Sequence, residues 1–375
     1  MQPTTMSAAT GVYLSAKKAP LEVRSAVYTP PGDDEIVIRN VAVAVNPLDW
    51  FKRDSGDIAF KWIKYPFIMG SDTAGEVVEV GAKVKRFSVG DRVLGHAVGM
   101  DERSNKSSEG AFQTYTILRQ NVTSHIPDFI SFEQACVLPL GLSTAASGLF
   151  MKNYLSLQPP SNQRKHTGET ILIWGGSTSV GCNAIQLARH AGYEVFTTAS
   201  TKNHHLLLKI GATKVFDYNS PTVIQDITQA FTGKNAAGAL AIGNGSTNAC
   251  IDVLSHCKGR KFVAQASADL PPGGFPTNSL GWIPFGLSML SSVARTTWKS
   301  KASGIEVKFI WGSDPAWNEV GGMIYEGFLP QALSQATYIP APEPIVLAGW
   351  DKVDEGLNLN RQGVSARKVV IRVGN

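Results

Sequence analysis

A glycine-rich turn between an apolar stretch and a helical stretch is the feature of the sequence with the clearest chemical meaning. Residues 170–174 (TILIW) have the composition of a buried strand, and residues 175–181 (GGSTSVG) follow directly. The helix expected over residues 180–191 would begin with unpaired N–H groups and a partial positive charge, which together bind anions. A dinucleotide pyrophosphate fits this turn. The spacing departs from G-x-G-x-x-G, so a glycine-rich turn without a ligand is the alternative.

The type of dinucleotide is indicated by the residues after the next expected strand, 194–198. A carboxylate at the end of this strand would hold the ribose 2′-hydroxyl of NAD, but residues 197–203 read TTASTKN and contain no acid. The hydroxyl of Ser200 and the ammonium of Lys202 would instead receive a 2′-phosphate. NADPH is therefore the expected cofactor. The alternative is that Lys202 is a solvated lysine at the start of a helix and contacts no phosphate.

The stretches around this turn predict an α/β protein with two different halves. Beyond residue 169, short apolar strands alternate with helices, which predicts right-handed crossovers and a doubly wound parallel sheet. Before residue 120, short strands punctuated by glycine predict an all-β unit. The final strand, residues 368–373 (KVVIRV), is expected to return to the β domain. The expected domains are 1–138 with 338–375 for the β domain, and 139–337 for the nucleotide-binding domain.

Length and composition agree with two domains and exclude several classes. The chain has 375 residues, 43% hydrophobic and 17% charged, with a net charge of +5. This mild excess suits an anionic small ligand, and no basic run is long enough to indicate nucleic acid. The four cysteines form no C-x-x-C pair, which favours reduced thiols. No stretch reaches the about 18–20 apolar residues of a membrane span. We expect a soluble, cytoplasmic protein.

Several motifs together resemble the medium-chain dehydrogenase/reductase superfamily along nearly the whole chain. They are NPLD (46–49), GSDTAGEVVEVG (70–81), VGDRV (89–93), EGAF (109–112), LPLGLSTA (138–145) and the glycine-rich turn. The resemblance implies a chaperonin-10-like (GroES-like) β domain and a Rossmann domain. Within the superfamily the sequence is most similar to fungal proteins labelled zinc-binding alcohol dehydrogenase-like and to trans-acting enoyl reductases of polyketide assembly, such as the lovastatin enzyme. Quinone oxidoreductases are more distant relatives.

The zinc label does not agree with the residues. Catalytic zinc in the family's alcohol dehydrogenases is held by two thiolates and a histidine, and the matching positions here are Asn46, Ser71 and Leu140. We therefore expect no metal. Without a Lewis acid, hydride addition to an activated C=C is more accessible than reduction of a simple ketone, because it needs only the placed cofactor and a group that holds the enolate oxygen.

The resemblance also implies contacts for each part of the cofactor and for the substrate. The expected cofactor contacts are Asn46, Leu48, Asp49, Trp50 and Phe51 at the nicotinamide, Ser177, Thr178, Ser179 and Val180 at the pyrophosphate, Ser200, Thr201, Lys202, Asn203 and Tyr218 at the 2′-phosphate end, Gln265 and Ala266 at the carboxamide, and Ser365 and Ala366 as a last contact. The expected substrate contacts are Leu140, Ser143 and Thr144.

The proton donor is the least determined part of the site. Some zinc-free relatives carry tyrosine or lysine two residues after the position of Asp49, but this chain has Phe51, which cannot donate. Lys52, Thr144 and Asp49 are the candidate catalytic residues. Water is a further candidate, Lys52 could be a surface lysine, and Asp49 could serve only to stabilise a turn.

Three functions follow from this sequence. The first is a zinc-independent, NADPH-dependent reductase of α,β-unsaturated carbonyls such as an enone, a quinone or an enoyl thioester. The second is a trans-acting enoyl reductase for a carrier-bound polyketide in fungal secondary metabolism, and the third is an NADPH-binding protein without turnover. Residues 269–303 are expected to form a lid over an apolar pocket, or else an oligomer contact. Residues 305–311 resemble the family's dimerisation edge, so a homodimer and a monomer both stay open.

Overall fold

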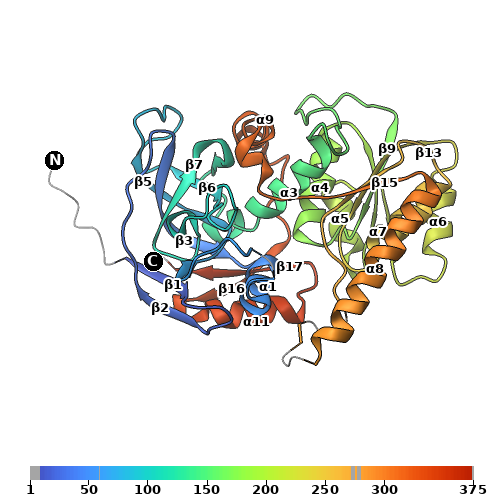
Figure 1. Ribbon diagram of the computed structural model, residues 1–375. Helices are drawn as coiled ribbons and strands as arrows, with labels where there is room; N and C mark the ends of the chain where they lie inside the picture. The colour runs from blue at the N-terminus through green and yellow to red at the C-terminus, as the bar shows by residue number, and fades with distance from the viewer. Residues whose placement is uncertain (1–8, 59, 272–274, 277–279, 374–375) are drawn as a thin grey trace. The chain divides into compact units, whose positions relative to one another are not determined.

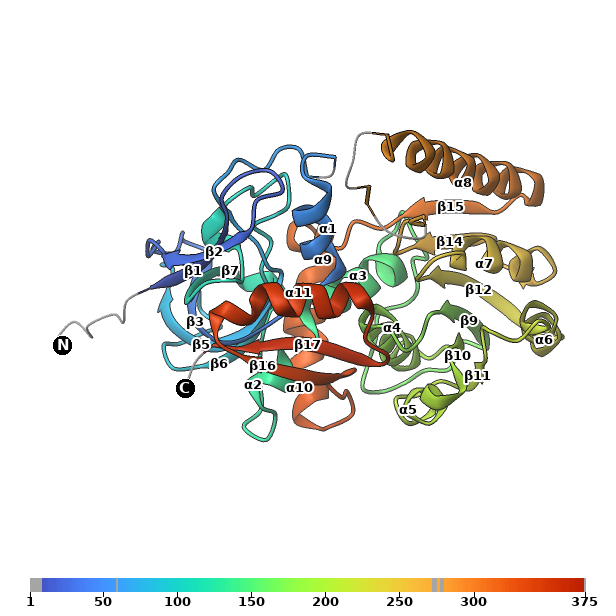
Figure 2. The same ribbon diagram turned by 90° about the horizontal axis from the view of Figure 1, so that it is seen from below.

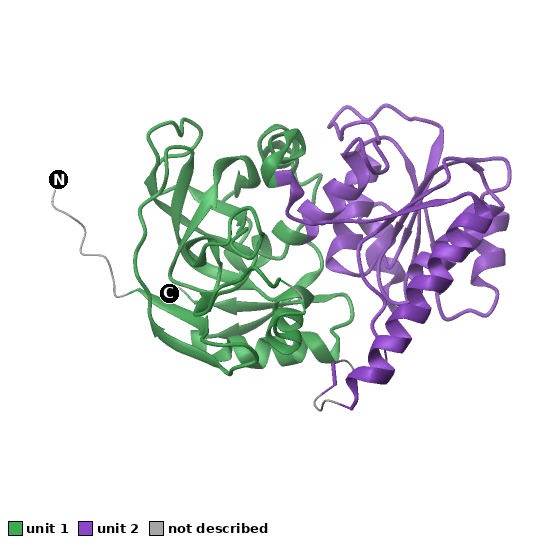
Figure 3. Cartoon of the chain, in the orientation of Figure 1, with its two compact units in different colours: residues 1–140, 316–375 green, residues 141–315 purple. Residues whose placement is uncertain are grey.

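The chain folds into two compact units in a computed structural model that describes residues 9–58, 60–271, 275–276 and 280–373 (Figure 3). Unit 1 comprises Met1–Leu140 and Ala316–Asn375, and unit 2 comprises Gly141–Pro315. The first division falls two residues after the expected boundary. The second differs more, because residues 316–337 belong to unit 1 rather than to the nucleotide-binding half.

Unit 2 is built on a parallel sheet in the order β11-β10-β9-β12-β14-β15, with the short β13 (Lys258–Gly259) paired to β12. With β9 as the first strand, this order reads 3-2-1-4-5-6, which is the Rossmann arrangement. The chain order reverses between β9 and β12, which lie side by side. The strands are β9 (Glu169–Trp174), β10 (Glu194–Thr198), β11 (Lys214–Phe216), β12 (Asn235–Ala241), β14 (Phe262–Gln265) and β15 (Glu306–Phe309).

Helices connect these strands and cover the sheet (Figures 1 and 2). A buried apolar cluster that includes Leu172, Phe196 and Ile251 forms the core. The helices are α3 (Pro139–Phe150), whose first two residues belong to unit 1, α4 (Ser179–His190), η3 (Thr201–Asn203), α5 (His204–Lys209), α6 (Val223–Ala230), α7 (Ser246–Ser255) and α8 (Trp282–Ser303).

The turn after β9 depends on the absence of side chains at its glycines. Gly175 has a φ of +87°, a conformation that favours glycine. A Cβ at Gly176 would lie 2.1 Å from Thr197 Oγ1, and one at Gly181 would lie 2.3 Å from the Gly175 carbonyl oxygen. Helix α4 therefore packs directly against the turn, which explains the glycines although their spacing differs from G-x-G-x-x-G.

Unit 1 contains a sheet in the order β16-β17-β3-β5-β6-β8, with β7 also paired to β3, and a smaller sheet in the order β2-β1-β4. The strands are β1 (Thr10–Leu14), β2 (Leu21–Ser25), β3 (Glu35–Ala44), β4 (Phe67–Ile68), β5 (Asp72–Val80), β6 (Arg92–His96), β7 (Tyr115–Arg119), β8 (Thr123–His125), β16 (Glu343–Ala348) and β17 (Arg367–Arg372). The expected return of the final strand to the β domain is confirmed, because β17 pairs with β3.

Short helices complete unit 1 and enclose a core that includes Ile36, Phe112 and Ile371. They are α1 (Pro47–Ser55), η1 (Ser107–Glu109), η2 (Gln120–Val122), α2 (Phe132–Ala135), η4 (Asp314–Trp317), α9 (Glu319–Gly322), the π-helical turn η5 (Met323–Phe328), α10 (Leu329–Ser334), η6 (Trp350–Lys352) and α11 (Val353–Gln362). Element η4 begins in unit 2 and ends in unit 1.

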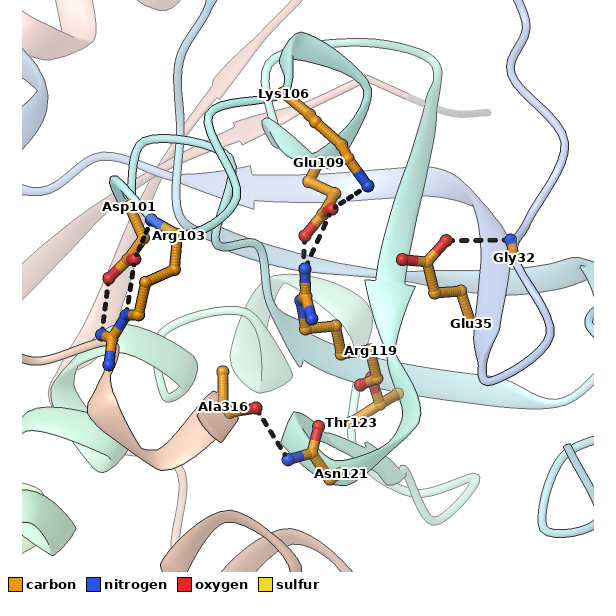
Figure 4. Close-up of polar contacts among 10 residues, drawn as sticks. All are labelled: Gly32, Glu35, Asp101, Arg103, Lys106, Glu109, Arg119, Asn121, Thr123 and Ala316. Atoms are coloured by element: carbon orange, nitrogen blue, oxygen red, sulfur yellow. Dashed lines mark hydrogen bonds and ion pairs between the residues drawn. The ribbon is translucent and has the colours of Figure 1, made fainter. Parts of the chain in front are cut away.

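Polar contacts hold the chain to unit 1 where it re-enters at residue 316. Asn121 donates a hydrogen bond of 3.1 Å to the carbonyl of Ala316 (Figure 4). The guanidinium groups of Arg103 and Arg119 lie 4.0 and 5.0 Å from the centroid of the Trp317 ring. Both guanidiniums are held by carboxylates, as Figure 4 shows for Arg103 with Asp101. These contacts hold the start of the segment 316–337 to unit 1, and the Tyr325 hydroxyl donates to the Pro139 carbonyl of the same unit at 2.7 Å. The helical pattern of the segment does not reveal this grouping.

The expected lid segment forms a helix on the outside of unit 2. Residues 272–274 and 277–279 lie outside the described residues, and helix α8 follows them. One face of α8 contacts α7, since Lys299 pairs with Asp252 at 2.6 Å and Asn248 donates to Thr296 at 3.1 Å. No described side chain of α8 is buried. A lid function for this helix stays a prediction.

Two further sequence predictions concern the thiols and the membrane. All four cysteines are buried, and none is in a disulfide in this structure; their reduced state stays a prediction. Among the described residues, no helix has the length and apolar character needed to cross a membrane.

The glycine turn gives a direct test of the packing argument. We predict that Gly176→Ala lowers the free energy of unfolding by about 1–3 kcal/mol, the range for overpacked cores. The strain has no easy outlet, because Thr197 Oγ1 is fixed by a 2.7 Å hydrogen bond to the Ile173 carbonyl. Urea denaturation measures the change.

Gly286→Ala in α8 is the matched control. A Cβ there meets nothing within 4 Å, and alanine favours a helix by up to about 1 kcal/mol over glycine. Equal effects of the two substitutions would contradict the packing argument.

Candidate active site

A buried carboxylate, Asp72, is the centre of a polar cluster in unit 1. It is the first residue of β5, and the sheet register places it opposite Ala44 of β3 on one side and His96 of β6 on the other. Its side chain is 0% exposed, and that of Lys368 on β17 is 4% exposed. The end of β3, the start of β5 and β17 therefore bring together residues that are far apart in the sequence.

The hydrogen bonds of Asp72 join three parts of unit 1. Its Oδ2 accepts from Asn46 Nδ2 at 2.8 Å and from Lys368 Nζ at 2.8 Å. Its Oδ1 accepts from the backbone N–H of Leu140 at 2.5 Å. Because Pro139 at the start of α3 has no N–H, the Leu140 amide is the first donor of that helix, and a carboxylate there is favourable. Lys368 Nζ also donates to Asn46 Oδ1 at 2.5 Å.

Asp49 lies beside this cluster, in the first turn of α1. Its Oδ2 accepts a 2.8 Å hydrogen bond from the Asn46 backbone N–H. Burial raises the pKa of Asp49 to about 7, and the amides of Asn46 and Gly70 offset part of the increase. A carboxyl with this pKa can hold or release a proton near neutral pH. The pKa of His96 shifts in the other direction. Burial lowers the pKa of this imidazole to about 4, so the ring is neutral at pH 7.

Lys52 has a different environment from the one expected of a proton donor. Its ammonium donates to the carbonyls of Gly56 and Phe60 at 3.0 and 3.2 Å and lies 3.4 Å from Asp57 Oδ1. These acceptors follow the end of α1, so Lys52 holds the chain where this helix ends. It is fully buried, which also removes the surface-lysine alternative. We do not retain Lys52 as a catalytic residue.

The other expected nicotinamide contacts occupy varied positions on α1. Leu48 and Trp50 are half-buried against the core of unit 1. The Trp50 indole N–H donates to Asn360 of α11 at 3.0 Å, so its polar edge is engaged within the unit. Phe51 is half-buried and lies against Trp50, with 6.4 Å between ring centroids.

Unit 2 brings together several of the expected cofactor contacts at the carboxyl end of its sheet. Residues 177–180 follow β9, residues 200–203 follow β10, and Gln265 and Ala266 close β14. Ligands of open α/β sheets bind at this edge, where the chain order reverses. Residues 177–180 are all partly exposed. The turn is thus accessible to a ligand.

Thr178 fixes the geometry of the turn. Its hydroxyl accepts from the Gly181 N–H at 3.0 Å and donates to the Gly175 carbonyl at 2.8 Å, which makes it the N-cap of α4. This threonine therefore satisfies one helix N–H itself and leaves others of the first turn for an anion.

The residues expected at the 2′-phosphate lie at the surface of unit 2. Lys202 and Thr201 are exposed, and Ser200 accepts a 3.3 Å hydrogen bond from the Asn203 amide. Tyr218, in the turn after β11, is 49% exposed. All are available to a solvent-borne ligand.

The remaining expected contacts are divided between the units. Ser143 and Thr144 of α3 are buried in unit 2, whereas Leu140 is half-buried in unit 1. In unit 1, Ser365 is exposed and Ala366 has a φ of +51° in the turn before β17. In the sequence, Ala366 lies two positions before Lys368.

Lys368 is the site residue that sequence reasoning missed. In the final strand (RKVVIR) it reads as one of several charges at the ends of an apolar stretch. Its neighbour Arg367 is exposed while Lys368 is buried. Because all four residues 368–371 are buried, the alternation of a strand does not distinguish the lysine position from the arginine position.

The residues at the expected zinc positions offer no metal-ligand set. Asn46 Oδ1 already accepts from an ammonium, and Leu140 contributes only a backbone N–H. Within the described ranges, no three His, Cys, Asp or Glu residues are grouped so that they could hold a metal ion. Cys136 is buried, which raises the pKa of its thiol well above the usual value, and it is not one of the positions matched to zinc ligands.

Comparison with known proteins agrees with this architecture. Residues 32–128 match the family model of the alcohol dehydrogenase GroES-like domain. Dehydrogenase pigH of Monascus ruber is 52% identical over 359 residues, which are 95% of this chain and 97% of that protein. The chain belongs to the medium-chain dehydrogenase/reductase superfamily. Its fold class and the resemblance described above are thereby confirmed, and the protein is an oxidoreductase of this superfamily.

A second relative and a solved structure are also similar to this chain. The trans-enoyl reductase himH of Aspergillus japonicus is 37% identical over 343 residues, covering 90% of each chain. The crystal structure of CurK enoyl reductase superposes with a TM-score of 0.72 over 98% of this chain and 100% of that chain, at 20% identity. The latter supports the fold of this medium-chain dehydrogenase/reductase.

Asp49 and His96 give opposite contributions to the pH dependence of stability. The pKa of Asp49 is raised in the folded state from 3.8 to about 7, so stability falls as pH rises through that range. The pKa of His96 is lowered from 6.5 to about 4, so stability rises with pH between these values. We predict that Asp49→Asn removes the falling contribution and makes the free energy of unfolding rise more steeply from pH 4 to about 6.5.

Urea unfolding at several pH values measures this slope. Asp128→Asn is the control, because the Asp128 side chain is fully exposed and this change should leave the slope as in the wild type. An unchanged slope in Asp49→Asn would show that Asp49 has an ordinary pKa.

Proposed function

We propose that this protein is a zinc-independent, NADPH-dependent reductase that delivers hydride to the activated C=C of an α,β-unsaturated carbonyl. The observation that carries the proposal is the buried Lys368 ammonium, hydrogen-bonded to Asn46 and Asp72. Asn46 corresponds to a zinc ligand of the family's alcohol dehydrogenases. A cation built into the protein is bound to it here, and the neighbouring donors do not suit zinc.

The lack of a suitable zinc set among the described residues favours conjugate reduction. Reduction of a simple ketone without a Lewis acid leaves a full alkoxide charge to be stabilised, whereas hydride addition to an enone or enoyl thioester gives a delocalised enolate. Hydrogen-bond donors can stabilise an enolate. The Asn46 amide is a donor in the cluster that we propose for this role.

The residues at the turn after β9 fit a dinucleotide. NADPH, when bound, supplies the hydride. The glycine turn and the partly exposed residues Ser177–Val180 would hold the pyrophosphate, and Ser200 with Lys202 would receive the 2′-phosphate. Gln265 and Ala266 would contact the carboxamide side.

Asp49 is the better supported of the remaining proton-donor candidates. Its pKa of about 7 gives it a mixed protonation state near neutral pH, which suits a general acid. Its Oδ2 is held by the Asn46 N–H, so the carboxyl has a fixed orientation. Thr144, which is 8% exposed, stays an alternative donor.

The names of relatives support an enoyl substrate. Those named trans-enoyl reductase include himH at 37% identity and tndF of Aspergillus flavipes at 29% identity. We therefore retain, as the second candidate, a trans-acting enoyl reductase for a carrier-bound polyketide in fungal secondary metabolism. A binder of NADPH without turnover remains the outcome if no unsaturated carbonyl is reduced.

We further propose that the protein forms a homodimer through β15. This strand is at the end of the sheet order, and Phe309 on it is 48% exposed. A strand at the edge of a sheet can pair with an edge strand of another chain; on β15 the Phe309 carbonyl already accepts from the Tyr154 hydroxyl at 2.8 Å.

The cofactor preference is tested by fluorescence titration with NADPH and NADH. We predict that the wild type binds NADPH at least about 10-fold more tightly than NADH. Lys202→Glu should reduce this preference about 10-fold, because the new carboxylate repels a 2′-phosphate; a 10-fold change corresponds to about 1.4 kcal/mol. Lys209→Glu, an equal charge change on the exposed side of α5, is the control and should keep the preference. Equal binding of both nucleotides by the wild type would contradict the assignment.

The reaction class is tested by turnover with a panel of enones, quinones, enoyl thioesters and saturated alcohols. We predict oxidation of NADPH with at least one unsaturated carbonyl and no oxidation of the alcohols. Absorbance at the nicotinamide band follows the reaction, and product analysis shows whether the C=C was reduced. Exclusive activity with alcohols would overturn the proposed function.

A further inference from the structure

The orientation of the Asn46 side-chain amide is fixed by two oppositely charged neighbours. Its Oδ1 accepts from the Lys368 ammonium at 2.5 Å, and its Nδ2 donates to the Asp72 carboxylate at 2.8 Å. A flipped amide would place oxygen against carboxylate and NH₂ against ammonium, and neither pair can form a hydrogen bond. The charges therefore allow only one orientation.

The same contacts make the amide a stronger donor. An ammonium bound to the amide oxygen draws electron density from the C–N group, and hydrogen bonds in a chain polarise one another. The Nδ2 group has two hydrogens, and Asp72 is its only partner among the described residues. One polarised N–H is left for a ligand oxygen.

Compared with an uncharged pair of similar shape, the ion pair between Asp72 and Lys368 adds little to the stability of the protein, although removal of one charge alone would be destabilising. Buried ion pairs gain little net free energy, because desolvation of both charges offsets their attraction. Asp72 and Lys368 are both nearly inaccessible to water. The property that they determine is the orientation and polarity of the amide between them.

We infer that Lys368 is a positioning residue that acts through Asn46, and that the free Nδ2 hydrogen of Asn46 is the donor for the enolate oxygen. This inference rests on the proposed function. Hydride transfer would break the C4–H bond of the nicotinamide, oxidise NADPH to NADP⁺ and form the new C–H bond at the β-carbon. The C=C π pair would move towards the carbonyl, so that its oxygen becomes negative. That oxygen would accept from Asn46 until the α-carbon takes a proton from an acid such as Asp49 and the carbonyl re-forms.

The central variant is Lys368→Met, which keeps much of the side-chain volume and removes the ammonium. We expect kcat for reduction of an unsaturated carbonyl to fall about 10- to 100-fold. This is less than the about 100- to 1000-fold range for loss of an oxyanion donor, because the Asn46 amide itself is retained. The KM and the affinity for NADPH should change less than about 3-fold, because the donor acts mainly on charge that develops in the transition state.

Two further variants separate positioning from stability. Arg119→Met breaks another ion pair of unit 1, with the fully buried Glu109, away from Asn46; it should lose stability but keep kcat within about 2-fold of the wild type. The double variant Asp72→Asn with Lys368→Met removes both charges and should regain stability without regaining kcat. Recovery of both stability and kcat in the double variant would overturn the inference. A loss of kcat in Arg119→Met equal to that in Lys368→Met would overturn it as well.

A spectroscopic measurement on the protein without ligands tests the orientation itself. With ¹⁵N-labelled asparagine, the two side-chain N–H signals of Asn46, assigned through Asn46→Ser, should exchange slowly with solvent in the wild type. They should shift and exchange faster in Lys368→Met but not in Arg119→Met. Unchanged signals in Lys368→Met would overturn the inference while leaving the proposed function intact. A wild type that reduces no unsaturated carbonyl would overturn the proposed function while this experiment still decides the amide orientation.

Discussion

The carboxylate of Asp72 is the interaction on which the candidate site depends. Its two oxygens accept from an ammonium on β17, from the side-chain amide of the residue that precedes α1, and from a backbone N–H at the start of α3. Because it is fully buried, loss of any of these donors would leave an uncompensated charge. The sheet pairing of β5 with β3 and β6 places it there. The sheet of the β domain thus fixes the position of the Asp72 carboxylate. The groups that bind this carboxylate belong to Asn46, Leu140 and Lys368.

The candidate cofactor site of unit 2 depends on close packing rather than on a buried charge. Its turn after β9 uses no buried charge; it uses the absence of side chains at Gly175, Gly176 and Gly181 to bring α4 onto the sheet. The N-terminal N–H groups of this helix then provide the positive potential that a pyrophosphate needs. Catalysis by hydride transfer requires both properties, a rigid donor set for the substrate and a complementary surface for the cofactor.

The sequence predicted what depends on local patterns. The βα repeats, the glycine turn and the motif at residues 46–49 have short-range signals, and the parallel sheet and β domain agree with them. Two features could not be predicted. Residues 316–337 have an ordinary helical pattern, and only long-range contacts such as that between Trp317 and Arg103 assign them to unit 1. Lys52 and Lys368 are both lysines near apolar residues, yet one ends a helix and the other pairs with Asp72, which depends on tertiary partners alone.

The central claim is that a protein ammonium, rather than a metal ion, provides the positive charge at Asn46. The most direct measurement is transfer of deuterium from NADPH deuterated at the transferable C4 position to an enoyl thioester, by protein exhaustively treated with a zinc chelator. The account predicts a saturated thioester with one deuterium at the β-carbon, formed at the rate of untreated protein. Loss of transfer after chelation, with recovery on addition of zinc, would contradict it.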